Sequence, residues 1–166
     1  MSALFSGRIH RFGDEVNTDV ILPGRYLALR KPEELGKHCM EGLDPDFIHR
    51  VRPGDILAVG RNFGCGSSRE HAVIALKAAG VAAIVAVSAA RIFFRNAVNL
   101  GLPVLLCAEA AGALREGEDA AIDLDAMAIT QGDRFWQAAP LGEEVRAILA
   151  AGGLVPRVRQ ALAAAA

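Results

Sequence analysis

The sequence predicts an α/β fold with a parallel strand–helix core, plus additional strands that form a second sheet or a small barrel. First, short apolar runs and stretches with helical features alternate between residues 56 and 106, a spacing typical of parallel α/β units. Second, apolar and polar residues alternate near the N-terminus and near residues 120–130. Third, a chain of 166 residues, 52% hydrophobic and 22% charged, suits one globular domain over residues 1–166.

The first expected element is a strand over Leu4–Phe12, where apolar and polar residues loosely alternate. Residues 17–19 (Asn-Thr-Asp) are predicted to form a polar turn. The short apolar run over 20–22 that follows is stopped by Pro23-Gly24.

A helix is predicted over Lys31–Met40. Pro32 suits the first helical position, and Glu33 and Glu34 favour a helix N-terminus because they oppose the positive end of the helix dipole. Another short helix is expected from Asp44 to His49.

The central unit begins with a buried strand over Ile56–Val59, which leads into a glycine-rich loop. A helix is predicted over Ser68–Ala79, with Ser68 as its N-cap, Glu70 in its first turn and Gly80 as its C-terminal stop. Three further elements complete the predicted unit: a strand over Val81–Val87, a helix over Ala90–Asn99 and a strand over Pro103–Leu106.

The C-terminal part is predicted to contain a hairpin and two helices. The alternating segment AAIDLDAMAIT, residues 120–130, indicates the hairpin. One helix is expected over Leu141–Ala151, stopped by two glycines. The other begins at Val155 and is expected to fray over Ala163–Ala166.

Composition and charge argue against several functional classes. A formal net charge of −1 gives no electrostatic basis for binding nucleic acid or an anionic membrane. We expect no signal peptide, and the apolar run over Gly80–Ala90 is too short to span a bilayer. Cys39, Cys65 and Cys107 are odd in number and lack CxxC spacing, so we expect free thiols, a cytoplasmic location and no metal site on this chain.

The stretch GRNFGCGSSREHAVIALKAAG, residues 60–80, does not fit three familiar motifs. No lysine follows the glycines as a P-loop requires, and Arg69 stands where a dinucleotide fingerprint has glycine. A nucleophile elbow needs glycine two residues after its serine, but Arg69 occupies that position after Ser67.

The same stretch is predicted to be an anion site, because a loop between a parallel strand and a helix presents free N–H groups at the sheet edge. Gly64 and Gly66 permit close approach by a ligand, and the guanidinium of Arg69 suits a carboxylate or a phosphate. Ser67 could act as a base there, since surrounding N–H groups stabilise an alkoxide. The plainer alternative is that Ser68 only caps the helix and Arg69 is a solvated charge.

Three motifs, in chain order GDEVNTDVILPGRYL, NFGCGSSREHA and ARIFFRNAVNLGLPVL, resemble the small-subunit family of 3-isopropylmalate dehydratase. That family is similar in turn to the swivelling C-terminal domain of aconitase and to homoaconitase small subunits. The resemblance runs from about Gly7 to Val155. It implies a swivelling β/β/α domain that works only with a large subunit, which carries a [4Fe–4S] cluster; none is implied on this chain.

By this resemblance, Ser67 is the base that removes a proton α to a carboxylate, and Arg69 holds a substrate carboxylate. Ser68 adds a hydrogen bond to that carboxylate, beside Gly66 in the same loop. Thr18 and Asp19 match the other pocket-facing turn of the family, and Asp19 is expected to orient active-site groups, although a role as a helix cap or turn residue is the alternative.

The resemblance also implies that Tyr26, Leu27, Ala28 and Leu29 bind the substrate and set specificity. Because Ala28 and Leu29 are aliphatic, they favour the isopropyl group of isopropylmalate over an extra carboxylate, and so predict a hydro-lyase of leucine biosynthesis. Dimethylmalate, methylmalate or homoaconitate remains an alternative substrate, and a non-catalytic anion-binding module an alternative function. The charges of residues 25, 30 and 31 are expected to be solvated.

Overall fold

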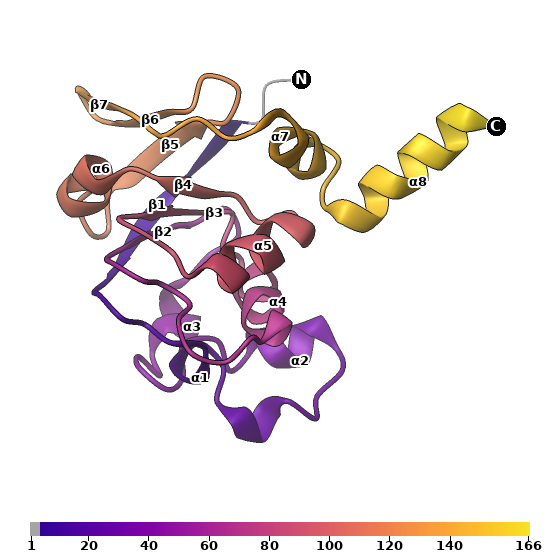
Figure 1. The fold of residues 1–166 in the computed structure, drawn as a ribbon. Helices are drawn as coiled ribbons and strands as arrows, with labels where there is room; N and C mark the ends of the chain where they lie inside the picture. The colour runs from indigo at the N-terminus through magenta and orange to yellow at the C-terminus, as the bar shows by residue number, and fades with distance from the viewer. Residues whose placement is uncertain (1–3) are drawn as a thin grey trace.

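In the computed structural model, which describes residues 4–166, seven strands form one sheet in the order β4-β3-β2-β1-β5-β6-β7 (Figure 1). β1 (Leu4–Phe12) lies at the centre, parallel to β2 (Ile56–Val59) on one side and antiparallel to β5 (Asp119–Asp123) on the other. The parallel half continues through β3 (Ala83–Ala86) and β4 (Val104–Leu106). The α/β class and its parallel core are therefore confirmed.

The additional strands form the antiparallel half of the sheet. β6 (Ala128–Gln131) pairs with β5, which confirms the predicted hairpin, and β7 (Arg134–Gln137) pairs with β6. The sequence did not indicate β7, nor the short helix α6 (Ala108–Ala113) that follows β4. Both halves are continuous through β1.

Alternate residues of the parallel strands face two hydrophobic clusters. Leu57 and Val59 of β2 pack with the cluster beneath α4 (Glu70–Ala79) and α5 (Arg91–Asn99). Ile56 and Ala58 pack with the other cluster, which includes residues of α6 and of the antiparallel strands. The parallel half is thus buried on both faces, which explains why its strands are apolar throughout.

Four short helices lie between β1 and β2, and all four differ from the prediction, two in kind and two in their bounds. They are α1 (Thr18–Ile21), the 3₁₀ helix η1 (Gly24–Tyr26), α2 (Pro32–Gly36) and α3 (Phe47–Arg50). Residues predicted as a polar turn instead begin α1, because the Asn17 side chain accepts hydrogen bonds from the N–H groups of Asp19 and Val20. The helix predicted over Lys31–Met40 ends at Gly36, where a Cβ atom would lie 2.9 Å from that of Ala78 in α4.

The start of α4 also differs from the prediction. The helix begins at Glu70, Arg69 is its N-cap residue with extended backbone, and no described side chain caps it, so Ser68 is not the cap. Gly80 ends the helix at φ 115°, as predicted.

The two C-terminal helices are α7 (Glu143–Ala150) and α8 (Leu154–Ala165). α8 is helical to Ala165, and the predicted fraying of its end stays a prediction. Figure 1 shows α8 projecting away from the rest of the chain. No helix in residues 4–166 combines the length and apolar character needed to cross a membrane.

One buried side-chain hydrogen bond joins β1 to the residue that precedes β2. The Nε2 atom of His10 is 2.7 Å from Oδ2 of Asp55, and the two residues are 2% and 5% exposed. Asp55 also accepts hydrogen bonds from the backbone N–H groups of Arg8 and Arg52. Burial by itself would raise the pKa of Asp55, but the hydrogen bonds from His10 and from the backbone outweigh it and lower that pKa.

Candidate active site at the glycine-rich loop

The glycine-rich loop runs between two other segments at the carboxyl ends of the parallel strands. On one side Gly64 N–H donates to the Val16 carbonyl over 2.8 Å, and Thr18 N–H donates to the Cys65 carbonyl over 2.9 Å. On the other side Ala90 N–H donates to the Phe63 carbonyl over 2.9 Å. These contacts extend the parallel pairing beyond the strands and place the loop where α/β folds bind ligands.

Gly64 and Gly66 are required for different reasons. Gly64 has φ 77° and is buried, and a Cβ atom there would overlap the ring of Phe93. Gly66 has φ 89° and is exposed, and a Cβ atom would lie 3.4 Å from that of Asn17. Packing therefore excludes a side chain at the first position, whereas only the backbone conformation disfavours one at the second.

Ser67 and Ser68 lie on the exposed turn just before α4. Thr18 fixes this turn, because its hydroxyl donates a hydrogen bond of 2.9 Å to the Ser67 carbonyl. Thr18 is only 2% exposed, so it supports the Ser67 turn from the interior. Since no described side chain caps α4, N–H groups of its first turn remain available to an anion beside these hydroxyls.

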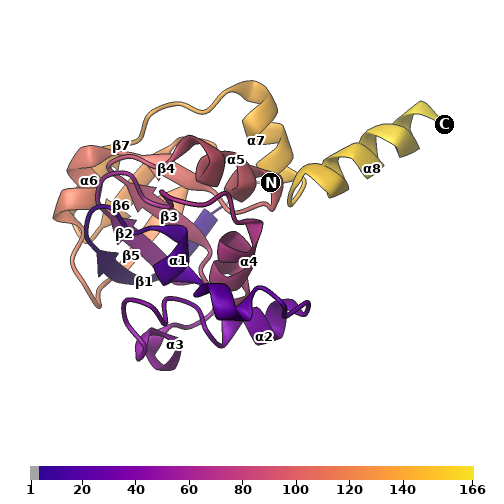
Figure 2. The same cartoon turned by 60° about the horizontal axis from the view of Figure 1, so that its bottom comes forward.

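Arg69 precedes α4, and its guanidinium lies between α1 and η1. Its Nη1 atom is 2.7 Å from Oδ1 of Asp19, and the two side chains are 22% and 55% exposed. The angles do not make this contact a hydrogen bond, and within residues 4–166 the buried Nη1 atom has no hydrogen-bond partner. A Cβ atom on Gly24 would lie 3.6 Å from Nη1 and 3.7 Å from Nη2. Figure 2 shows α1, which carries Asp19, beside α4.

Cys65 is not an activated thiol. Its Sγ atom lies 3.8 Å from Oε2 of Glu15, and both burial and this carboxylate raise the pKa of the thiol. The Asn62 side chain donates to the same Glu15 oxygen over 2.9 Å. Neither Glu15 nor Asn62 was predicted to take part. Both occupy positive φ, which asparagine adopts more often than most residues but which is uncommon for glutamate, and the sequence alone does not reveal it.

The predicted specificity residues lie on and just after η1. The Tyr26 hydroxyl donates to Oε1 of Glu41 over 2.6 Å, so its polar group is directed at that residue. Leu27 and Leu29 are half-buried against the core, which leaves Ala28 exposed between them.

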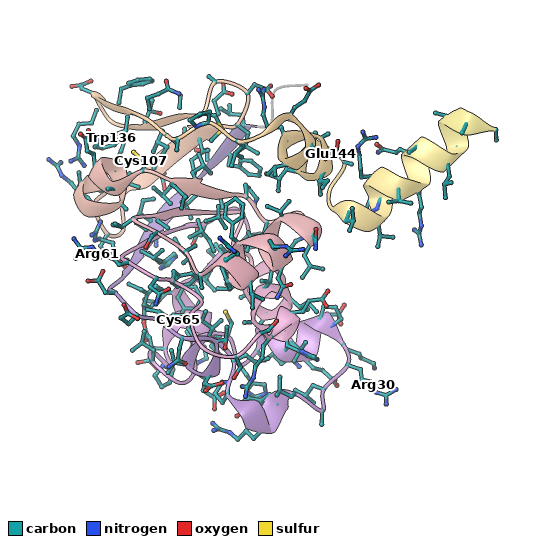
Figure 3. The ribbon with its side chains drawn as sticks, in the orientation of Figure 1. Arg30, Arg61, Cys65, Cys107, Trp136 and Glu144 are labelled. Carbon is teal, nitrogen blue, oxygen red and sulfur yellow. The ribbon has the colours of Figure 1, made fainter. Side chains whose placement is uncertain are left out.

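The flanking charges differ among themselves. Arg30 and Lys31 are exposed, and Figure 3 shows Arg30 pointing away from the chain and from the loop that carries Cys65. Arg25 is exposed but paired, with Nη2 lying 2.5 Å from Oε1 of Glu41.

The donor atoms of the described chain do not suit a metal cluster. Within residues 4–166, no group of three or more His, Cys, Asp or Glu side chains could hold a metal ion. Cys39 is fully buried, which raises the pKa of its thiol, and Cys65 and Cys107 are separate free cysteines. An iron–sulfur cluster therefore does not fit these residues.

Comparisons with known proteins identify similar chains along nearly the whole length. Residues 26–109 match the aconitase C-terminal domain family. The chain is 49% identical to the 3-isopropylmalate dehydratase small subunit of Heliobacterium modesticaldum, with 96% of this chain and 97% of the relative covered. It is 46% identical to the isopropylmalate/citramalate isomerase small subunit of Methanocaldococcus jannaschii, with 98% of each covered. The crystal structure of a 3-isopropylmalate dehydratase from that organism has a TM-score of 0.88 and 44% identity, covering 95% of this chain and 94% of the other.

Proposed function

The chain belongs to the aconitase C-terminal domain family, among small subunits of the 3-isopropylmalate dehydratase type, and from this premise we propose how its residues serve the reaction. The enzyme is a hydro-lyase that interconverts 2- and 3-isopropylmalate by loss and return of water, and the small subunit works with a large one. A non-catalytic anion-binding module is not favoured, since relatives over nearly the whole chain are named as dehydratase subunits.

Membership of this family implies an iron–sulfur cluster on the large subunit. We assign a [4Fe–4S] cluster, with the Lewis acidity that it supplies when bound, to that partner, because the described donors of this chain do not suit it. A cytoplasmic assembly is proposed as well, supported by the three free cysteines.

Ser67 is the proposed base. Its alkoxide takes a proton from the carbon next to a substrate carboxylate and becomes a hydroxyl, and hydroxide leaves the neighbouring carbon to give an alkene. Hydroxide then adds to the carbon that lost the proton, and Ser67 returns its proton to the neighbouring carbon. Support comes from the exposed position of Ser67 before the uncapped N-terminus of α4, where N–H groups stabilise an oxyanion.

Arg69 is the proposed carboxylate-binding group, and this assignment depends on one observation. Its guanidinium contacts the Asp19 carboxylate through Nη1, and the side chain is 22% exposed just after Ser67 and Ser68, so its other N–H groups can bind a substrate carboxylate. Asp19 orients the guanidinium through its contact with Nη1. Ser68 and the backbone of Gly66 are placed to add hydrogen bonds to the same carboxylate.

The substrate class is proposed from the residues beside η1. Ala28 is exposed between the half-buried Leu27 and Leu29, so an aliphatic group meets carbon atoms there. An extra carboxylate would lose its hydration without a partner, at a cost of several kcal/mol. A branched malate is therefore favoured over homocitrate. Because the Methanocaldococcus relative is also named for citramalate, smaller malates belong in any test.

The decisive experiment is anaerobic co-purification of this chain with its large subunit, followed by assay with 2- and 3-isopropylmalate, citramalate, dimethylmalate and homocitrate. We expect isopropylmalate to have the highest kcat/KM, and the small chain alone to be inactive. Faster turnover of homocitrate would contradict the proposed role of Ala28 and its neighbours. Activity of the isolated small chain would contradict the shared active site.

A further inference from the structure

We propose that Glu41 is a positioning residue for the reaction: its carboxylate holds η1 in place so that Gly24 packs against the guanidinium of Arg69. The inference rests on the proposed role of Arg69 in binding a substrate carboxylate. It extends that role to a residue that lies outside the glycine-rich loop and outside the predicted specificity residues.

Glu41 is the common acceptor of three side chains. Its Oε1 atom accepts from the Tyr26 hydroxyl over 2.6 Å and from Arg25 Nη2 over 2.5 Å. Its Oε2 atom lies 2.6 Å from His38 Nδ1. The rings of Tyr26 and His38 stack with centroids 3.6 Å apart and planes 10° apart, and the Arg25 guanidinium lies 4.7 Å from the Tyr26 ring centroid. Two of the three residues of η1 are therefore attached to one carboxylate.

The backbone around Glu41 is itself fixed to α1. Met40 N–H donates to the Ile21 carbonyl over 2.7 Å, and Gly42 N–H donates to the Val20 carbonyl over 3.1 Å. A Cβ atom on Gly42 would lie 2.6 Å from the Val20 Cα atom, so the two segments are in close contact. The carboxylate of Glu41 thus extends from a fixed point next to the helix that carries Asp19.

η1 in turn forms one side of the Arg69 site. It begins at Gly24, which precedes the two anchored residues and lies against both terminal nitrogens of the guanidinium. Asp19 lies on α1 and contacts the same group. Glu41 joins η1 to the segment that is hydrogen-bonded to α1. It therefore fixes the positions of Gly24 and Asp19 relative to each other around Arg69.

The charge of Glu41 is maintained across the neutral range. The hydrogen bond from Tyr26, followed by that from His38, lowers the pKa of Glu41 to about 2. Hydrogen bonds to a carboxylate are stronger than those between neutral groups, so replacement by an amide weakens all three contacts without changing the shape of the side chain.

The test compares Glu41→Gln with Asp44→Asn in the complex with the large subunit. Asp44 is a matched control: its side chain is also 27% exposed, and its Oδ2 atom lies 2.5 Å from Arg50, away from η1. We expect Glu41→Gln to raise KM for isopropylmalate about 10-fold while kcat changes by less than about 3-fold, because misplacement of a binding group weakens orientation. The control should leave both constants within about 2-fold, as is usual for an exposed ion pair.

A double variant shows whether Glu41 acts through Arg69. In an Arg69→Gln background, Glu41→Gln should raise KM no further, since the group that it positions is absent. Equal KM effects of Glu41→Gln in the two backgrounds would overturn the inference, as would an unchanged KM in the single variant. If Arg69→Gln alone leaves KM unchanged, the proposed function itself fails, and this outcome is separate from a failure of Glu41.

A second variant keeps the test valid if Glu41→Gln does not assemble. Tyr26→Phe removes the hydroxyl that donates to Glu41 and retains the ring that stacks on His38. It should raise KM in the same direction by about 3-fold, in proportion to one lost hydrogen bond. An unchanged KM in this variant counts against the inference.

Discussion

Asp19 Oδ1 lies 2.7 Å from Arg69 Nη1 and so joins α1 to the residue that precedes α4. The two residues are 50 positions apart in the chain and come from two different motifs. The Asp19 carboxylate is more than half exposed, so the ion pair contributes little to folding. Its effect is expected on the orientation of the guanidinium.

Replacement of Asp19 by Asn should separate these two effects. We expect the free energy of unfolding to change by less than about 1 kcal/mol, as for other exposed ion pairs. The kcat/KM of the complex should fall about 10-fold because the Arg69 guanidinium loses one of its fixed neighbours. Asp125→Asn is the matched control, since Asp125 lies 4.0 Å from Arg146 at 57% exposure. Equal falls in kcat/KM in the two variants would contradict a role of Asp19 in the site.

Replacement of Ser67 by Ala should reduce kcat about 10²–10⁴-fold, because the proposed base is lost. Ser67 is exposed, so thermal unfolding and assembly with the large subunit should be unaffected. Ser68→Ala serves as the comparison and should have the smaller effect, about 10-fold, as expected for one hydrogen bond to a charged group. A larger loss of kcat in Ser68→Ala would indicate that Ser68, and not Ser67, is the base.

The two glycines of the loop should respond differently to alanine. Gly64→Ala is expected to destabilise the fold by roughly 3 kcal/mol or more, because the new methyl group overlaps the Phe93 ring at a positive φ. Gly66→Ala meets only an ordinary contact and should cost about 1–2 kcal/mol through its backbone conformation. Urea unfolding of both variants measures the difference. Similar losses would show that the Phe93 contact is unimportant.

Removal of Asp55 should be among the most destabilising changes outside the site. Asp55→Ala leaves the buried His10 ring and two backbone N–H groups without their acceptor. We expect a loss of about 3–5 kcal/mol in urea unfolding, as for other broken buried pairs. Asp44→Ala, which breaks a partly exposed pair, should cost less than about 1 kcal/mol.

Acid should remove the stabilising effect of Glu41. Its pKa in the folded chain, about 2, lies below the ordinary value of 4.5. The contribution is therefore fully present above pH 4.5 and is lost as the pH falls from 4.5 to about 2. Urea midpoints of the unmodified chain and of Glu41→Gln should converge over this interval. A constant separation down to pH 2 would contradict a depressed pKa.

The core was predictable because its signals are local. Each buried parallel strand is a short apolar run, and Gly80 marks the end of α4. α6 and β7 were missed for equally local reasons: α6 is short and contains Gly112, and β7 is the polar-flanked segment Arg134–Gln137 at the edge of the sheet. Neither has the apolar periodicity that indicates an element.

The site was predictable only in part. The glycine-rich loop is visible in the sequence, but the turn before α4 carries a hydrogen bond from Thr18 to Ser67 that no local pattern reveals. Glu41 had no sequence signal, because its two contacts with η1 join residues 15 and 16 positions apart through irregular turns. Such contacts follow from tertiary packing, so propensity and spacing do not predict them.

The central place of β1 also bears on how the chain is made. β1 ends at Phe12, yet its two neighbours in the sheet begin at Ile56 and Asp119. During synthesis, both edges of β1 therefore stay unpaired until much of the chain has left the ribosome. The edge that pairs with β5 stays unpaired longest. Nascent chains stalled before residue 119 should expose that edge to chaperones, and refolding of the finished chain should be slowed by these distant pairings.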